Sequence, residues 1–215
     1  MKRLFVMALA LLLLAGCAVA PTRERDYDGK DDKPGFRQEE ISVETRAPMP
    51  KVNVTFTLYD NGPEEHAEVV GTSEEGTVLW RYETPAVPLA MVSQHGEVGI
   101  WEDRYYLVAC GKLVALSLTD GTVLWENEEF EGSISSGCKV IGADGTVYLA
   151  GFLGPDFFAC DAQGNTLKRV VTIDPDYFWA CGLTVEDGVA TVYMSGGPEG
   201  DMGRENAVPL TVALP

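Results

Sequence analysis

A five-residue phrase, Gly-Thr-Val-Leu-Trp, constrains the fold of this chain more than any other feature of its sequence. It begins at Gly76 and again at Gly121, 45 residues later. A third copy, 43 residues further on, keeps a turn at Gly164 but has Lys168 where the tryptophan stood. Repetition at a nearly constant spacing indicates that one supersecondary unit is built several times along the chain.

A second landmark recurs with the same spacing. A cysteine stands seven residues before a turn glycine and a tyrosine-containing apolar run, at Cys138 and again 43 residues later at Cys181. Short runs such as VNVTFTLY, RYYLVA, LVALSL and TVYLA lie between turns rich in glycine and aspartate. Such runs predict short strands and an all-β domain. About four strands in each unit of about 43 residues are typical of a β-propeller blade.

Four repeats can be drawn in the domain predicted for residues 51–215: 51–85, 86–130, 131–173 and 174–215. The first is short, and the last stops before its outer strand. We therefore expect a small or partial propeller of about four four-stranded blades. Whether the ring closes stays open at this point. An open ring would expose strand edges and allow a homodimer.

The segment from Ala115 to Trp125, Ala-x-Ser-x-x-Asp-Gly-x-x-x-Trp, resembles the tryptophan docking motif of quinoprotein-type (PQQ-like) propeller repeats. The glycine permits a tight turn between the third and outermost strands, and the tryptophan packs between neighbouring blades. This resemblance implies a fold and says little about function. The residues expected to dock the blades are Gly76, Trp80, Ala115, Gly121, Trp125, Ala159 and Gly164.

The N-terminal residues are typical of an exported lipoprotein. Lys2 and Arg3 precede an apolar run that ends in Leu-Ala-Gly-Cys, which resembles the lipobox of bacterial lipoproteins. We expect a signal peptide at 1–16, acylation of Cys17 (palmitate among the acyl chains), and a flexible tether over 17–50. The protein would then be anchored in the bacterial cell envelope, on the plasma or the outer membrane.

Charge and motifs exclude several functions. The net charge of −17 disfavours binding to nucleic acid. An acidic stretch around Gly29 has Gly35 where a calcium loop needs its final glutamate, so a metal site is not expected. His66 and His95 lack metal-ligand spacing and are predicted to be surface or turn residues. We expect no catalytic residue, cofactor or metal.

The cysteines after Cys17 leave two interpretations open. Cys138 and Cys181 occupy one repeat position on adjacent inner strands, so a disulfide between them is allowed in an oxidising compartment. The alternative is that Cys110, Cys138, Cys160 and Cys181 are small buried apolar residues.

Long loops at one end of the propeller are expected to form the binding face, because functional residues concentrate on loops held by a rigid scaffold. The expected residues are Phe130, Asp156, Asp174, Asp176, Tyr177, Phe178 and Trp179. Phe178 and Trp179 could instead begin an inner strand and pack in the core. We expect a non-catalytic scaffold that binds another envelope protein, as a propeller lipoprotein of the resembled family assists outer-membrane barrel assembly. A surface sensor for a sugar or small ligand is the alternative, and a quinone- or metal-dependent enzyme is less favoured.

Overall fold

The described part of the chain folds into antiparallel β-strands joined by turns and loops. The computed structural model describes residues 51–60, 62–89, 93–152, 154–197 and 206–215, which belong to one compact unit, Thr45–Pro215. The expected signal peptide, Cys17 and tether lie outside these residues. The strands are β1 (Asn53–Asp60), β2 (Glu64–Thr72), β3 (Val78–Glu83), β4 (Val87–Pro88), β5 (Gly96–Trp101), β6 (Arg104–Ala109), β7 (Lys112–Ser117), β8 (Val123–Asn127), β9 (Ser133–Ile141), β10 (Val147–Phe152), β11 (Phe157–Cys160), β12 (Thr166–Val170), β13 (Trp179–Glu186), β14 (Val189–Ser195) and β15 (Val208–Ala213).

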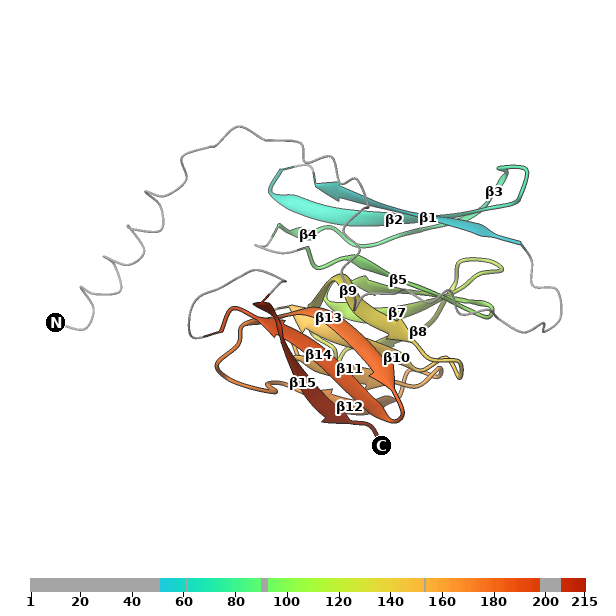
Figure 1. Cartoon of the computed structure of the whole chain (residues 1–215). Coiled ribbons are helices and arrows are strands. Elements are labelled where there is room, and N and C mark those ends of the chain that lie inside the picture. The colour runs from blue at the N-terminus through green and yellow to red at the C-terminus, as the bar shows by residue number, and fades with distance from the viewer. Residues whose placement is uncertain (1–50, 61, 90–92, 153, 198–205) are drawn as a thin grey trace. The chain divides into compact units, whose positions relative to one another are not determined.

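These strands form four sheets that follow one another along the chain (Figure 1). Sheet A consists of β1, β2 and β3, with the short β4 also paired to β2. Sheets B (β5 to β8) and C (β9 to β12) are four-stranded meanders, and sheet D contains β13, β14 and β15. The described residues therefore form an all-β, partial β-propeller, as the repeats predicted.

Only sheets B and C contain the full set of four equivalent blade strands. The turn glycines Gly76, Gly121 and Gly164 follow β2, β7 and β11, which makes these three strands equivalent. By this alignment, sheet A begins at the second strand of a blade, whereas sheet D has the first three. This agrees with the expectation that the first repeat is short and that the last stops before its outer strand.

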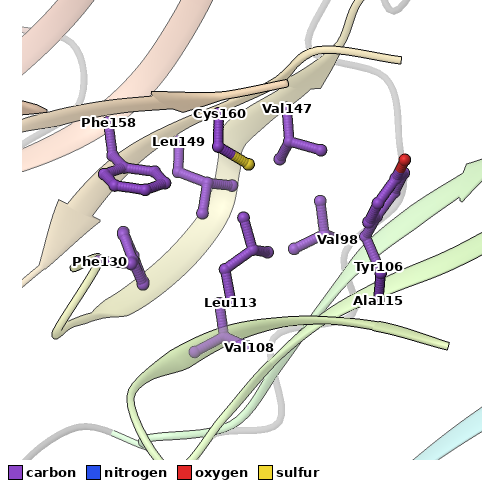
Figure 2. Packing of buried hydrophobic residues seen from close by; sticks show 10 residues of the cluster. All are labelled: Val98, Tyr106, Val108, Leu113, Ala115, Phe130, Val147, Leu149, Phe158 and Cys160. Carbon is purple, nitrogen blue, oxygen red and sulfur yellow. The ribbon is translucent and has the colours of Figure 1, made fainter. Parts of the chain in front are cut away.

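Three buried clusters hold neighbouring sheets together. Between sheets A and B, Val69 and Trp80 pack with Tyr105 and Leu107. Between sheets C and D, Phe157 and Ala159 pack with residues that include Met194. Figure 2 shows the cluster between sheets B and C, whose members are Val98, Tyr106, Val108, Leu113, Ala115, Phe130, Val147, Leu149, Phe158 and Cys160. Each central sheet buries both faces, which explains the continuous apolar runs of β6 and β7.

The outward faces of sheets A and D carry many polar side chains, although apolar ones such as Val70 lie among them. Side chains alternate between the two faces of a strand, so Glu68 points away from the face on which Val69 is buried. On this outward face Glu68 accepts hydrogen bonds from Tyr59 and Arg81. On sheet D, Thr184, Thr191 and Thr211 lie side by side in register. None of the three clusters joins sheet D to sheet A, so among the described residues the propeller is an open stack.

Candidate functional site

Several long connections meet at one end of sheets C and D. Because neighbouring strands are antiparallel, the C-terminal ends of β10, β12 and β14 lie at the same end as the beginning of β13. The loop from β10 to β11 and the link 171–178 are therefore neighbours. The tight turns at Gly145, Gly164 and Gly188 connect strands at the opposite end.

Asp156 connects the two segments. Its backbone N–H donates to the carbonyl of Val171 at 3.3 Å, and its carboxylate Oδ2 accepts from the N–H of Ile173 at 2.6 Å. Only 9% of the residue is exposed. Burial raises the pKa of the Asp156 carboxyl, although the hydrogen bond from Ile173 favours the ionised form and opposes this shift. Asp156 thus orders the link and places a buried acid at this end of the protein.

A local turn shapes the rest of the link. The Asp174 side chain accepts a hydrogen bond from the N–H of Asp176 at 3.0 Å, and its carbonyl accepts from the N–H of Tyr177 at 3.3 Å. This is the turn chemistry for which aspartate is favoured. The N–H of Phe178 then donates to the carbonyl of Ser195 at 3.1 Å, which joins the link to the end of β14. Phe178 is therefore held by its backbone.

The three aromatic residues of this segment have different environments. Phe178 is 72% exposed. Tyr177 is half-buried and packs against the cluster between sheets C and D. Trp179 is the first residue of β13, half-buried, with its ring centroid 5.3 Å from that of Phe152. The alternative that these residues begin the inner strand and pack in the core therefore holds in part for Trp179. It does not hold for Phe178, whose side chain is largely exposed.

A cleft of about 380 Å³ opens beside Phe178. The described residues that line it are Gly151, Gly154, Asp156, Val171, Thr172, Pro175, Tyr177 and Phe178. Asp156 is the charged residue among them. The structure thus brings three of the predicted binding residues, Asp156, Tyr177 and Phe178, to one cleft, with Asp174 and Asp176 in the adjoining turn.

Sequence reasoning did not select the two glycines of this cleft. A Cβ on Gly151 would lie 2.3 Å from the carbonyl oxygen of Pro155, and one on Gly154 would lie 2.7 Å from Cα of Gly132. Both positions therefore exclude a side chain because backbone approaches closely. Gly-Pro pairs mark loops in a sequence. They do not show which other segment the loop will contact.

Phe130 does not belong to this surface, and its prediction as a binding residue is wrong. It is 0% exposed and packs edge-on against Phe158, with ring centroids 5.5 Å apart. The surrounding acidic sequence suggested an exposed loop. The neighbouring sheet C covers the ring.

Most of the predicted docking residues lie at the sheet interfaces, but Gly76 does not, because no described atom lies within 4 Å of its Cβ position. The Trp80 indole of sheet A lies against Gly121 of sheet B and donates from Nε1 to the carbonyl of Leu118 at 2.7 Å. The Trp125 indole of sheet B lies against Gly164 of sheet C and donates to the carbonyl of Ala162 at 3.1 Å.

Small residues face the docking positions across each sheet. Ala115 pairs with Trp125, and Ala159 pairs with Lys168. In sheet A, Gly71 takes this role, because a Cβ there would lie 2.2 Å from the Trp80 ring. The small side chains leave room for an indole to lie across the sheet.

A further docking tryptophan, Trp101, was not predicted. Its indole covers Gly145 of sheet C, and its Nε1 donates a hydrogen bond to the carbonyl of Ala143 at 3.1 Å. The Arg104 guanidinium lies over the ring, 5.4 Å from its centroid. Trp101 ends the first strand of its blade and stands outside the Gly-Thr-Val-Leu-Trp phrase. The sequence feature that could have indicated this contact is the aspartate-glycine turn at Gly145 in the next repeat.

The allowed disulfide between Cys138 and Cys181 is not formed among the described residues. The inner strands do lie close, since a Cβ on Gly137 would be 3.9 Å from the Cys181 carbonyl oxygen. The Cys181 thiol, however, donates to the carbonyl of Tyr193 in its own sheet at 3.2 Å. Cys138 is buried in the cluster between sheets C and D.

His95 lies between a bend and the start of β5, as a turn residue would, but it is buried rather than at the surface. It is 5% exposed, and its Nδ1 accepts a hydrogen bond from the N–H of Cys110 at 3.3 Å. Burial lowers the pKa of His95, although the nearby Glu65 carboxyl opposes this. His66 lies half-buried on the outward face of sheet A and stacks on Tyr59 at 4.9 Å.

Within the described ranges, no group of three or more His, Cys, Asp and Glu residues is placed to hold a metal ion. The part of the chain that the structure describes also contains no helix long and apolar enough to cross a membrane.

Comparison with known proteins shows similarity of fold alone. No family model and no curated protein sequence matches the chain. The crystal structure of the computationally designed Ika4 protein matches with a TM-score of 0.50 at 13% identity, covering 84% of this chain and 100% of that one. BamB from Moraxella catarrhalis matches with a TM-score of 0.42 at 18% identity, over 63% of this chain and 41% of that one. This chain therefore matches less than half the length of the BamB chain.

Proposed function

We propose that this protein is a lipid-anchored protein of the bacterial cell envelope whose partial propeller binds a segment of another envelope protein. The observation that carries the proposal is the cleft at the end of sheets C and D, where a largely exposed Phe178 stands beside the buried Asp156. The proposal assigns no catalytic residue. A stoichiometric absorbance change on titration with PQQ and calcium would overturn this part.

The cleft offers apolar, aromatic and acidic groups together. Phe178, Tyr177 and Val171 supply apolar surface, and Asp156 supplies a carboxylate. A lysine or arginine can interact with an aromatic face and a carboxylate at once, while its aliphatic stem covers apolar surface. We therefore propose that the partner contributes a basic residue next to an apolar one. Aromatic anchors of this kind often dominate binding energy.

The scaffold around the cleft is suited to binding without rearrangement. The Asp156 hydrogen bonds join one loop to the link, and the hydrogen bond from Phe178 to Ser195 joins that link to β14. An ordered site loses less conformational entropy when a ligand binds than a mobile loop does. These contacts support a preformed binding surface.

Site-specific photocrosslinking in the native envelope tests the proposal. A benzoylphenylalanine at position 178 should give a discrete heterologous adduct, because this side chain borders the cleft. The matched control is the same group at Ile100, which is 47% exposed on sheet B. Phe178→Ser should then weaken binding of the identified partner at least tenfold. Ile100→Ser is the control and should leave this binding unchanged. Equal adducts at both positions would refute the assignment.

A small ligand, such as a sugar, is the second candidate. Its support is the cleft volume of about 380 Å³, which lies within the range of small-molecule sites. Calorimetric titration with mono- and oligosaccharides separates the candidates. Saturable sugar binding that Phe178→Ser abolishes would favour this alternative over a protein partner.

The anchor is a separate part of the proposal. Cys17 lies outside the described residues, and its acylation rests on the sequence alone. Cys17→Ser should leave either a longer, unprocessed product or a soluble one. A variant with the mass and detergent partitioning of the wild type would show that Cys17 is not acylated.

A further inference from the structure

Three turns of this protein each hold a tryptophan from the preceding sheet in the same way. The turn glycines Gly121, Gly145 and Gly164 have positive φ angles of 71°, 82° and 87°. At each glycine an added Cβ would lie 2.6 to 2.7 Å from an indole carbon, so the ring rests directly on the backbone.

The hydrogen bonds of these turns follow one rule. The N–H groups of the three glycines donate to the carbonyls of Ser117, Gly142 and Asp161. In each turn the next residue along the chain supplies the carbonyl that accepts the indole N–H, and these residues are Leu118, Ala143 and Ala162. The turn therefore offers an apolar contact over glycine and one correctly placed acceptor.

The turn between β2 and β3 in sheet A has the same construction without an indole. Gly76 has a φ of 80°, and its N–H donates to the carbonyl of Ser73 at 3.0 Å. By the rule of the other three turns, the carbonyl of Glu74 is the equivalent acceptor. Among the described residues, a Cβ added to Gly76 would have no atom within 4 Å, so no described segment covers this glycine.

The chain's own tryptophans are already placed elsewhere. The sequence contains four, and three of them cover Gly121, Gly145 and Gly164. The fourth, Trp179, is half-buried against Phe152. A second copy of the chain has the same four tryptophans in the same positions, so it has no unused docking tryptophan to offer.

We propose that the Gly76 turn is a docking site for a tryptophan carried by an extended strand of another protein. The three occupied turns support this proposal, because sheet A packs on sheet B, and sheet B on sheet C, through the same contact between an indole and a turn glycine. The outward face of sheet A is the next position in that series. This site lies on a different sheet from the cleft at Phe178 and does not depend on it.

The charge around the site specifies the flanks of that strand. Glu74 and Glu75 are both exposed beside Gly76, and Glu74 pairs with Lys51 at 2.8 Å. The whole chain carries a net charge of −17. A tryptophan flanked by lysines therefore suits the site better than one flanked by acids.

The test uses a synthetic peptide, Lys-Gly-Thr-Val-Leu-Trp-Lys-Asn-Lys, which is a basic version of the protein's own docking phrase. Titrated into the ¹⁵N-labelled full chain, it should shift the Gly76 amide signal upfield through the ring current of the indole. The same peptide with alanine for tryptophan should shift this signal at least tenfold less.

Two matched variants locate the binding. Gly76→Asn introduces a residue that tolerates a positive φ but whose Cβ occupies the place of the indole. The affinity for the peptide should therefore fall at least tenfold. Gly188→Asn is the control, because Gly188 has a φ of 76° and also has nothing within 4 Å of its Cβ position. This variant should bind as the wild type does.

Several results would overturn the proposal. These are no shift at Gly76 at millimolar peptide, equal shifts with the alanine peptide, or equal effects of the two asparagine variants. Self-association of the chain that Gly76→Asn abolishes would make a second copy the occupant and would also refute it. Loss of binding on Phe178→Ser, with Gly76→Asn unaffected, would place the peptide in the cleft instead.

Discussion

Truncating Trp80 to alanine should destabilise the fold more than any other single aromatic truncation at the docking turns. The residue is 6% exposed, and burying an aromatic side chain of this size removes roughly 200 Å² from water. At about 25 cal/mol per Å² this corresponds to about 5 kcal/mol as an upper value. Measured truncations of large aromatic core residues to alanine cost about 3 to 5 kcal/mol. We therefore expect a loss of about 4 kcal/mol.

A pair of glycine variants separates the docking contact from the turn conformation. Gly121 and Gly76 both have positive φ, so alanine at either should cost about 1 to 2 kcal/mol for backbone conformation alone. A Cβ at Gly121 would also lie 2.6 Å from the Trp80 indole, whereas at Gly76 it meets nothing within 4 Å. Gly121→Ala should therefore cost about 1 to 3 kcal/mol more than Gly76→Ala, as overpacked core positions do.

Urea unfolding followed by far-ultraviolet circular dichroism measures these differences, since removing Trp80 would change a fluorescence signal directly. If the slope of the unfolding free energy against urea concentration is the same in each variant, the native and unfolded states are comparable between the proteins. For a protein of this size, 4 kcal/mol corresponds to a fall in Tm of roughly 8 to 16 °C. Equal effects of the two glycine variants, or a Trp80→Ala loss below about 1 kcal/mol, would refute the docking assignment.

Three further predictions concern single side chains. Trp125→Ala should cost about 2 to 3 kcal/mol in urea unfolding, less than Trp80→Ala, because the Trp125 ring is only half-buried; a larger loss at Trp125 would contradict this order. Burial raises the pKa of the Asp156 carboxyl above 3.8, so the native state binds this proton more tightly than the unfolded state does. The protonated carboxyl therefore contributes to the free energy of unfolding below pH 3.8, and this contribution is lost as the pH rises through the folded-state pKa. Asp156→Asn should therefore gain stability relative to the wild type as the pH rises above 3.8, and a constant difference between the two proteins would exclude the effect. Burial raises the pKa of the Cys160 thiol to about 12, so native-state alkylation at pH 8 should modify the half-buried Cys110 first, as peptide mass mapping would show.

The open stack follows from the outward faces of its terminal sheets. The Tyr59, Glu68 and Arg81 side chains satisfy one another on sheet A, and sheet D presents one row of three threonines. Burying either face against the other would remove charged and hydroxyl groups from water without an evident partner for each. A partner protein can supply complementary groups to such a face.

The all-β class, the repeat spacing and the turn positions could be predicted because neighbouring residues determine them. A glycine such as Gly121 accepts a positive φ that other residues disfavour, and alternating strands with tight turns need only local chemistry. The repeated tryptophan indicated an interface at Trp80 and Trp125 because a large aromatic residue on an outer strand requires a covering partner. Local patterns also directed attention to the loop with Asp156 and to the link with Phe178.

Tertiary structure alone decided which side chains of those loops face solvent. Phe130 and Phe178 both stand in acidic connecting segments, yet Phe158 of the neighbouring sheet covers one and the other is 72% exposed. The cleft depends on a contact between Asp156 and Ile173, 17 residues apart, and on glycines that admit close backbone approach. The open stack likewise depends on which faces the sheets present to one another. Burial is set by what distant segments place around a residue, and a local sequence pattern does not carry that information.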